Sequence, residues 1–557
     1  MKRLLSAFVF VLLFTTVTNG GPGPARASSP RIGTNLFAQS PLSSDIPFVD
    51  VFKTSAPWSA KSLAPGVPPA PLALDAEGWV VRLAPGQGAE TRIFQNGRAH
   101  YPGGLYTVFY DGIGWLDISG AGVSVVDRAA GQIKVLVKPT PGPNGGITIV
   151  ERDTDPANPL RRIRFVMPGF ETSYLKDPFN PLFLERLKPF RAIRFMEWQR
   201  INYAQTQEWA DERSPDYETQ TAPSYTSTDR LSGVALEYQI DLANRLGADP
   251  WFTVPVRASD DFVRHMAELV HRRLRPNLHV YLEYGNETWN QYFSANHDYV
   301  TNKGLAAGLS SDRRLANIYQ YATRSSEIFR IWSGVYGPDQ GRLRRVFSAV
   351  TYDPKFTETG LTFLKSQGGK ADVLAIAPYV SPRTLVNWQP VDSSFYDRIV
   401  SMSVPQVLIR LDDEVDEHVK PLIERYADLA RRFGLTLVAY EDGVDLNTLA
   451  MEPRQVAAYR GKIADLFTAV SRDPNMSRIF THMFDSWFNS GGDLLMIHTF
   501  AAEPDWYGAS GLLEYQDQPP ETAPKYRAVM DYLGVKADQA APAHARDRSK
   551  TRNRSKG

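Results

Sequence analysis

The chain has 557 residues, of which 43% are hydrophobic, so it is long enough for a large core and for more than one domain. Its formal net charge of +1 argues against a nucleic acid partner, because phosphate-binding proteins usually carry a basic face. It contains no cysteine, which excludes disulfides, thiolate metal sites and a cysteine nucleophile.

Residues 1–27 have the pattern of a signal peptide. Lys2 and Arg3 precede an almost wholly apolar run over residues 4–17, and Ala25-Arg26-Ala27 offers a cleavage site between small residues. A membrane anchor is the alternative, but the run is shorter than the ~20 residues that a spanning helix needs. We therefore expect bacterial export to the periplasm or the medium, with cleavage and without stable membrane insertion.

Two patterns of short strands follow the signal peptide. Residues 28–74 contain strand candidates at 31–37 and 48–52. Either one could be the first strand of the parallel barrel that residues 171–536 are predicted to form. Residues 75–170 hold closely spaced strand patterns, punctuated by Gly and Pro and without helical periodicity. This second pattern predicts a β-sandwich accessory domain.

Residues 171–536 alternate between strand and helix patterns. Strands are predicted at residues 190–196, 250–256, 278–285, 346–350, 373–377, 435–441 and 494–499. With one strand from the N-terminal segment, this alternation predicts an α/β fold, a (β/α)8 TIM barrel. No Gly-rich phosphate loop follows a strand, which argues against a nucleotide-binding fold. Residues 537–557 are predicted to be a disordered basic tail.

Two of the predicted strands end in a glutamate. Residues 278–285 lead into Asn286-Glu287-Thr288-Trp289, and residues 435–440 lead into Glu441. Parallel barrels keep their active sites at the carboxyl ends of the strands, so both groups belong at the same rim. Cleavage of a glycosidic bond needs two carboxyl groups, one for the leaving oxygen and one for the anomeric carbon. The pair therefore indicates glycoside hydrolysis.

This arrangement resembles clan A of the glycoside hydrolases, the retaining (β/α)8 enzymes that include cellulases, mannanases, xylosidases and glucuronidases. The resemblance covers roughly residues 170–535. It implies that Glu287 is the acid/base and that Glu441 is the nucleophile. It also implies that Arg194 pairs with the nucleophile, that Tyr379 donates a hydroxyl hydrogen to it, and that Asn286 holds the 2-hydroxyl of the sugar.

Aromatic residues near the strand ends are the expected contacts for the face of a sugar ring. The clan commonly places a Trp after the eighth strand as the floor of this subsite, whereas this chain has Phe500 there, with Trp506 six residues further on. Either residue is a candidate floor. Trp289 is a further stacking candidate, and His498 is expected to line the pocket.

Three other acidic residues lie close to these positions. Glu283 is expected to form a buried salt bridge with an Arg or Lys of the barrel. Glu197, at the end of the strand that carries Arg194, is expected to be a structural partner, with a functional carboxylate as the alternative. Asp442 adjoins Glu441, and spacing alone does not choose between the two.

The sequence therefore predicts a secreted retaining glycoside hydrolase that cleaves a β-linked polysaccharide, with β-glucan and endo action as candidates. The alternative is a non-catalytic carbohydrate-binding protein on a barrel scaffold. For the β-sandwich, packing against the barrel is favoured over carbohydrate binding, because no exposed aromatic row is evident. No metal or other cofactor is expected, since the nine histidines show no ligand spacing. The expected partner is a polysaccharide or oligosaccharide, and the oligomeric state stays open.

Overall fold

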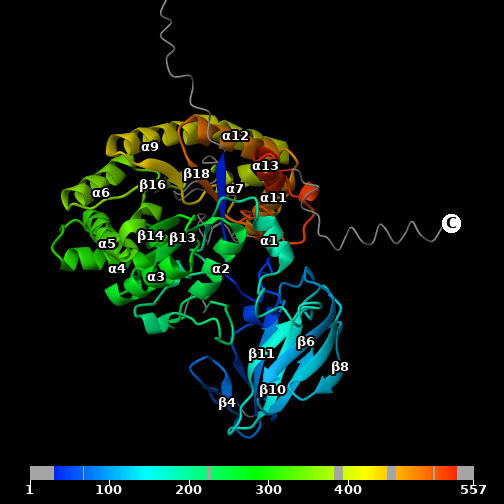
Figure 1. Ribbon diagram of the computed structural model, residues 1–557. Helices are drawn as coiled ribbons and strands as arrows, with labels where there is room; N and C mark the ends of the chain where they lie inside the picture. The colour runs from blue at the N-terminus through cyan, green and yellow to red at the C-terminus, as the bar shows by residue number, and fades with distance from the viewer. Residues whose placement is uncertain are drawn as a thin grey trace, which may run out of the picture.

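The computed structural model describes residues 30–66, 68–222, 227–381, 393–447, 459–505 and 508–535. The expected signal peptide, the expected basic tail and Trp506 lie outside these ranges. Figure 1 shows a large body of strands ringed by helices and a smaller body of strands at its side. In the described part of the chain, no helix combines the length and the apolar character that a membrane crossing requires.

The large body is a closed barrel of parallel strands, so the predicted fold class is confirmed. In order around the barrel the strands are β1 (Arg31–Asn35), β12 (Ala192–Arg194), β13 (Asp249–Val254), β14 (Val280–Tyr284), β15 (Leu343–Ser348), β16 (Val373–Ile376), β17 (Thr436–Ala439) and β18 (Leu494–Ile497). Strand β1 pairs with both β12 and β18, which closes the barrel. Of the two candidates for the first strand, residues 31–37 therefore contain it, whereas residues 48–52 form two isolated bridges and part of the 3-10 helix Val51–Thr54.

Helices surround the barrel (Figure 1). They are α1 (Pro181–Leu187), α2 (Leu236–Leu246), α3 (Asp260–Arg273), α4 (Ser294–Ala306), α5 (Arg313–Tyr336), α6 (Pro354–Ser366), α7 (Ser393–Ser401), α8 (Val404–Glu414), α9 (Lys420–Phe433), α11 (Arg460–Arg472), α12 (Met476–Asn489) and α13 (Pro524–Tyr532). Local chemistry sets their ends: the Ser259 hydroxyl accepts from the Phe262 N–H at 3.2 Å at the start of α3, and Gly247 adopts the left-handed conformation that ends α2.

Side chains fill the inside of the barrel. Trp251, Tyr281 and Met496 are buried there together with smaller residues from neighbouring strands. A Cβ atom on Gly33 would lie 2.4 Å from the Met496 sulfur, so the packing leaves no room for a side chain on this residue. Because the interior is a packed core rather than a channel, substrate has access only to the loops at the strand ends.

The small body contains two antiparallel sheets. One has the order β2 (Ser59–Ser62), β5 (Gln87–Ile93), β10 (Ile147–Thr154), β7 (Gly114–Ser119); the other has the order β11 (Arg161–Val166), β6 (Gly104–Asp111), β9 (Gln132–Val137), β8 (Val123–Ala129). A short hairpin, β3 (Ala73–Leu74) with β4 (Val80–Arg82), accompanies them. The first sheet begins with β2, before residue 75, where the sequence prediction started the domain. The prediction missed β2 because its sequence, Ser-Ala-Lys-Ser, is polar and has no alternating apolar residues.

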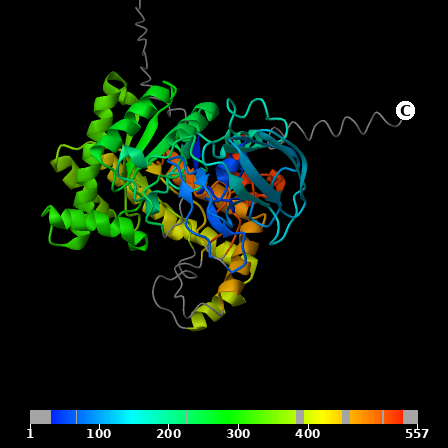
Figure 2. The same cartoon turned by 90° about the horizontal axis from the view of Figure 1, so that it is seen from below.

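The sandwich contacts loops of the barrel (Figure 2). The Lys53 ammonium, just before the sandwich, donates to the carbonyl of Pro215 at 2.6 Å, and the Ser214 hydroxyl donates to Glu77 at 2.6 Å. On another loop, Arg98 forms a salt bridge with Glu503 at 2.6 Å. These contacts join the segment before the sandwich, the β3–β4 hairpin and the loop between β5 and β6 to segments that follow barrel strands β12 and β18.

Candidate active site

The carboxyl ends of the barrel strands bring several predicted residues into one cluster. Arg194 ends β12, Tyr379 follows β16 and Glu441 follows β17. The Arg194 Nη1 donates to Glu441 Oε1 at 2.7 Å, and the Tyr379 hydroxyl donates to Glu441 Oε2 at 2.9 Å. Both oxygens of Glu441 thus accept a hydrogen bond, one of them from the Arg194 cation, and the two contacts fix the orientation of the carboxylate.

Arg194 is fully buried and donates hydrogen bonds to the other polar residues of the cluster. Its guanidinium also donates to Glu283 at 2.9 and 3.2 Å, to Asn286 Oδ1 at 2.9 Å and to Asn35 Oδ1 at 3.1 Å. The prediction that Glu283 forms a buried salt bridge with a barrel Arg is therefore confirmed. With Glu441 included, each of the five N–H groups of the guanidinium has an acceptor, so the orientation of Arg194 is fully determined.

Glu287 occupies a sharp turn after β14. Gly285 has φ of 58° and Glu287 itself has φ of 41°, a backbone region that residues other than glycine rarely adopt. Its carboxyl group accepts hydrogen bonds from Asn290 Nδ2 and from the Tyr440 hydroxyl, both at 2.7 Å. Burial, and then the nearby negative charge of Glu441, raise the pKa of Glu287. The environment therefore favours the protonated form, as a general acid requires.

The structure separates Glu441 from its neighbour Asp442. Asp442 has 1% exposure, and its carboxylate accepts from the Gly443 N–H at 2.7 Å, while its other oxygen has no partner among the described residues. Burial raises the pKa of Asp442 well above its ordinary value. Glu441 is the residue that meets Arg194 and Tyr379, which resolves the choice that spacing left open.

Three residues of the cluster were not identified from the sequence: Asn35, Asn202 and Tyr440. Asn202 Oδ1 accepts from Asn286 Nδ2 at 2.9 Å, and Tyr440 donates to Glu287 while its ring lies 5.2 Å from the Arg194 guanidinium carbon. No motif marks them, because closure of the barrel is what brings them to the site. Only the position of Tyr440 directly before Glu441 gave a usable signal.

Two of the residues predicted to contact the sugar, His498 and Trp289, keep exposed surface near the cluster. The His498 ring is partly exposed and lies edge-on to the Tyr379 ring, with centroids 6.5 Å apart. Trp289 is partly exposed and packs edge-on against Tyr321 at 6.2 Å. His498 thus lies next to Tyr379, the hydrogen-bond partner of Glu441, and Trp289 lies two residues after Glu287. The predicted Trp506 is outside the described residues.

The prediction that Phe500 contacts the sugar is wrong. Phe500 has no exposed surface and packs edge-on against Phe183 of α1, with ring centroids 5.7 Å apart. Its N–H donates to the Asn35 carbonyl at 3.0 Å, which turns the chain after β18 so that this side chain enters the core between strands and helices. A ring buried in this way has no face to offer a ligand.

Glu197 is a third acidic residue near the pair. It follows β12, remains partly exposed, and accepts a hydrogen bond from Asn202 Nδ2 at 3.3 Å. Burial among protein groups, and then the charge of Glu441, raise its pKa to about 7.

Solved structures of glycoside hydrolases match this chain. One is a 4-O-α-L-rhamnosyl-β-D-glucuronidase from Fusarium oxysporum, at 10% identity and a TM-score of 0.33, covering 61% of both chains. Another is a glucosidase from Croceicoccus marinus, at 12% identity and 0.34, covering 63% of both chains. A third is a GH5 broad-specificity endoglucanase from Clostridium acetobutylicum, at 10% identity and 0.32, covering 64% of this chain and 89% of that one.

These likenesses do not extend to substrate or mechanism. The matched part spans about three fifths of the length of the first two structures. No protein-family model matches the sequence, and no curated protein matches it.

Proposed function

We propose that the protein is an exported glycoside hydrolase that cleaves β-linked polysaccharide, with β-glucan as the candidate, by a retaining double displacement. The observation that supports this most is the contrast between two carboxyl groups at one barrel rim. Glu441 accepts from Arg194 and Tyr379, which aim its carboxylate, while burial and the charge of Glu441 raise the pKa of Glu287. A carboxylate held in place by two donors and a carboxyl group that keeps its proton can serve as nucleophile and acid.

In the first step, Glu441 attacks the anomeric carbon and the bond to the leaving oxygen breaks. Glu287 transfers its proton to that oxygen, so a neutral alcohol departs and a covalent glycosyl ester with Glu441 remains. In the second step, the ionised Glu287 removes a proton from water, the water oxygen attacks the anomeric carbon, and Glu441 leaves as a carboxylate. Two inversions give net retention of configuration.

The neighbours of the pair have matching tasks. Arg194 and Tyr379 orient Glu441 for attack, and Tyr440 and Asn290 orient the carboxyl group of Glu287. Asn286, held by Arg194 and Asn202, is positioned to meet the 2-hydroxyl of the sugar, a contact that strengthens in the transition state.

The test is release of reducing ends from a panel of β-glucans, xylans and mannans, with the first-formed anomer followed by NMR. We expect release from a neutral β-glycan with the β-anomer appearing first. If the α-anomer appears first, the protein is a glycosidase but its mechanism is inverting, and the retaining mechanism is rejected. Binding to the polymers without release would support the non-catalytic carbohydrate-binding alternative. Export is tested by N-terminal sequencing of secreted protein, which we expect to begin at Ser28.

A further inference from the structure

The carboxylate of Glu197 accepts fewer hydrogen bonds from the protein than it has the capacity for. Its Oε1 accepts from Asn202 Nδ2 at 3.3 Å, and no other hydrogen bond to its carboxylate is found among the described residues. Glu283, on the neighbouring part of the barrel, accepts from Arg194, Trp251, Thr253 and Ser348. Glu197 is only partly exposed and has a single long hydrogen bond from the protein, so its carboxylate can accept further hydrogen bonds from a ligand.

Hydrogen bonds connect Glu197 to the Arg194 cluster through Asn202 and Asn286. Asn202, its partner, accepts from Asn286, and Asn286 in turn accepts from Arg194. The charged and titratable groups that face Glu197 are Glu441 and Arg194, and its own charge acts on Tyr203. Glu197 keeps exposed surface in this setting, so its second oxygen is available to whatever lies beside Glu441.

Arg194 cannot serve as the receptor for an acidic sugar. All five of its N–H groups already donate to Glu283, Glu441, Asn286 and Asn35. A sugar carboxylate in the same space would therefore meet the negative charges of Glu441 and Glu197 without a free donor from this guanidinium. Like charges brought together in a poorly solvated site repel strongly.

We propose that Glu197 determines specificity: its free oxygen accepts hydrogen bonds from hydroxyl groups of the sugar bound beside Glu441, and it excludes uronic acids, so the substrate is a neutral β-glycan. This inference rests on the glycosidase function proposed above and names the class of its substrate. Glu197 is a binding residue in this scheme and takes no part in bond breaking.

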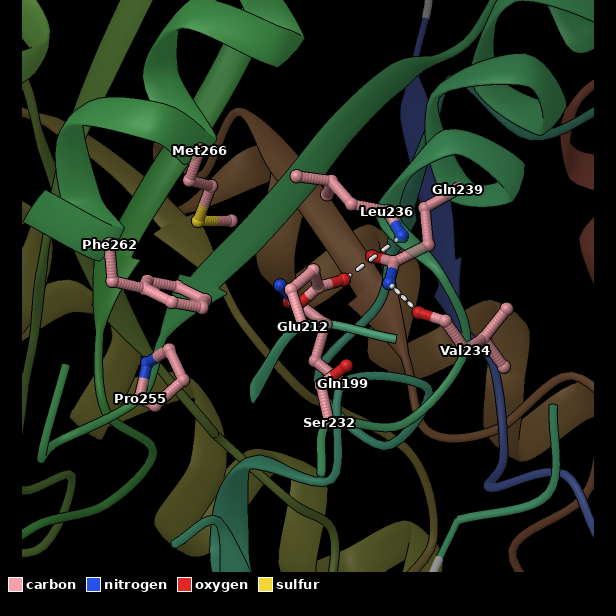
Figure 3. Close-up of a pocket in the computed structure, with 9 residues that line it drawn as sticks. All are labelled: Gln199, Glu212, Ser232, Val234, Leu236, Gln239, Pro255, Phe262 and Met266. Carbon is pink, nitrogen blue, oxygen red and sulfur yellow. Dashed lines mark hydrogen bonds between the residues drawn. The ribbon is translucent and has the colours of Figure 1, made fainter. Parts of the chain in front are cut away.

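A second acidic residue of the same loop provides a matched control. Glu212 lies in a small pocket with Gln199 and Gln239, where its Oε1 accepts from the Leu236 N–H at 3.1 Å (Figure 3). Burial raises the pKa of Glu212 to about 8. It is thus also a half-buried acid in the segment between β12 and α2, but no contact of the described structure joins it to Glu441 or Arg194.

The experiment compares 4-nitrophenyl β-glucoside and 4-nitrophenyl β-glucuronide, which differ only in having a hydroxymethyl group or a carboxylate at C5. We expect the wild type to prefer the glucoside. Glu197→Gln keeps the shape and removes the charge, so kcat/KM on the glucoside should fall about 10- to 100-fold, the loss expected for a hydrogen bond to a charged group. The ratio of glucoside to glucuronide turnover should fall by at least tenfold.

Two further readouts separate binding from a structural role. The kcat/KM profile of the wild type should contain an ionisation near pH 7 that Glu197→Gln lacks and Glu212→Gln retains. Glu197→Asp keeps the charge and should still reject the glucuronide, which preserves the test if the Gln variant fails to fold. Unchanged substrate ratio and pH profile in Glu197→Gln, or a wild type that prefers the glucuronide, overturns the inference. A wild type without turnover on any neutral or acidic glycoside overturns the proposed function itself.

Discussion

Arg194 and Glu441 are separated by 247 residues and joined by a 2.7 Å hydrogen bond between Nη1 and Oε1. Strands β12 and β17, which carry or precede them, do not pair directly, since β1 and β18 lie between them on the shorter way around the barrel. The contact therefore depends on closure of the whole sheet. A substitution that breaks the pairing of β1 with β12 or β18 should therefore separate Arg194 from Glu441, the proposed nucleophile, and leave the Glu441 carboxylate misoriented.

The proposed roles of the two carboxyl groups predict different responses to rescue. Glu441→Ala removes the attacking group, so added azide should attack from the opposite face and give a glycosyl azide of inverted configuration. Glu287→Ala should lose at least ~10²-fold on an unactivated glycan and much less on a dinitrophenyl glycoside, which needs no proton at its leaving group. With azide, this second variant should give a product of retained configuration.

The control for this prediction is Asp442→Asn. Asp442 contacts the Gly443 N–H rather than Arg194, so we expect this variant to keep the kcat of the wild type within a few-fold, roughly the effect of a small shift in the loop. Product configuration is measured by NMR. Exchange of the two rescue patterns between Glu441→Ala and Glu287→Ala would show that the roles are reversed.

The Tyr440 hydroxyl should set the pH range of activity through Glu287. Its hydrogen bond to Glu287 Oε1 lowers the pKa of that carboxyl group and partly offsets the rise caused by burial and Glu441. Tyr440→Phe removes this donor, so the pKa of Glu287 should rise further. Because the acid is active when protonated, the alkaline limb of kcat/KM should move to higher pH.

A matched control for Tyr440→Phe is Tyr281→Phe. Tyr281 is also buried inside the barrel, but its hydroxyl accepts from Arg31 at 3.2 Å, away from the two carboxyl groups. We expect its pH profile to match that of the wild type. A profile of Tyr440→Phe that moves to lower pH, or that moves equally in Tyr281→Phe, contradicts the assignment of this hydroxyl to Glu287.

Strand periodicity was enough to predict the barrel and to place Glu287 and Glu441 at one rim, because parallel strands have their carboxyl ends on the same side. The places of Arg194, Asn286 and Tyr379 beside them came from the resemblance to clan A and not from local pattern. The first barrel strand was not decided by local pattern. Arg31–Asn35 gains its place by pairing with β18, which ends the barrel more than 450 residues later in the chain, and no local signal encodes that contact.

Phe500 and β2 show the limits of local pattern in a different way. Phe500 was predicted to face the sugar because it is aromatic and follows the last strand, yet the turn after β18 directs it toward Phe183. Strand β2 was missed because Ser-Ala-Lys-Ser has no apolar alternation; it exists because it pairs with β5. In both cases tertiary contacts override what neighbouring residues indicate.

Deletion of residues 75–170 should prevent folding of the barrel. The remaining chain would keep β2, Phe52 and Trp58, which belong to the sandwich, but would lose the sheet and core that cover them. It would also lose the contacts of Glu77 and Arg98 with loops of the barrel. We expect insoluble protein, measured by sedimentation and circular dichroism. A soluble variant with full activity would show that the sandwich is dispensable.

Glu151 should make stability fall as pH rises. Its side chain is completely buried in the sandwich, and neither carboxyl oxygen has a hydrogen-bond partner in the described part of the chain. Burial raises its pKa to about 8 from an ordinary value of 4.5. The folded state therefore binds this proton more tightly than the unfolded state, so the contribution is complete below pH 4.5 and is lost as pH approaches 8.

The variant that isolates this effect is Glu151→Gln, which has no proton to lose. The difference in unfolding free energy between variant and wild type should grow in favour of the variant between pH 5 and 8, by up to about 1.4 kcal/mol per pH unit. Urea unfolding at several pH values measures it. Glu268→Gln, an exposed change on α3, is the control and should follow the wild type at each pH. A difference for Glu151→Gln that stays constant across this range would mean that Glu151 keeps an ordinary pKa in the folded protein, with water reaching its carboxylate.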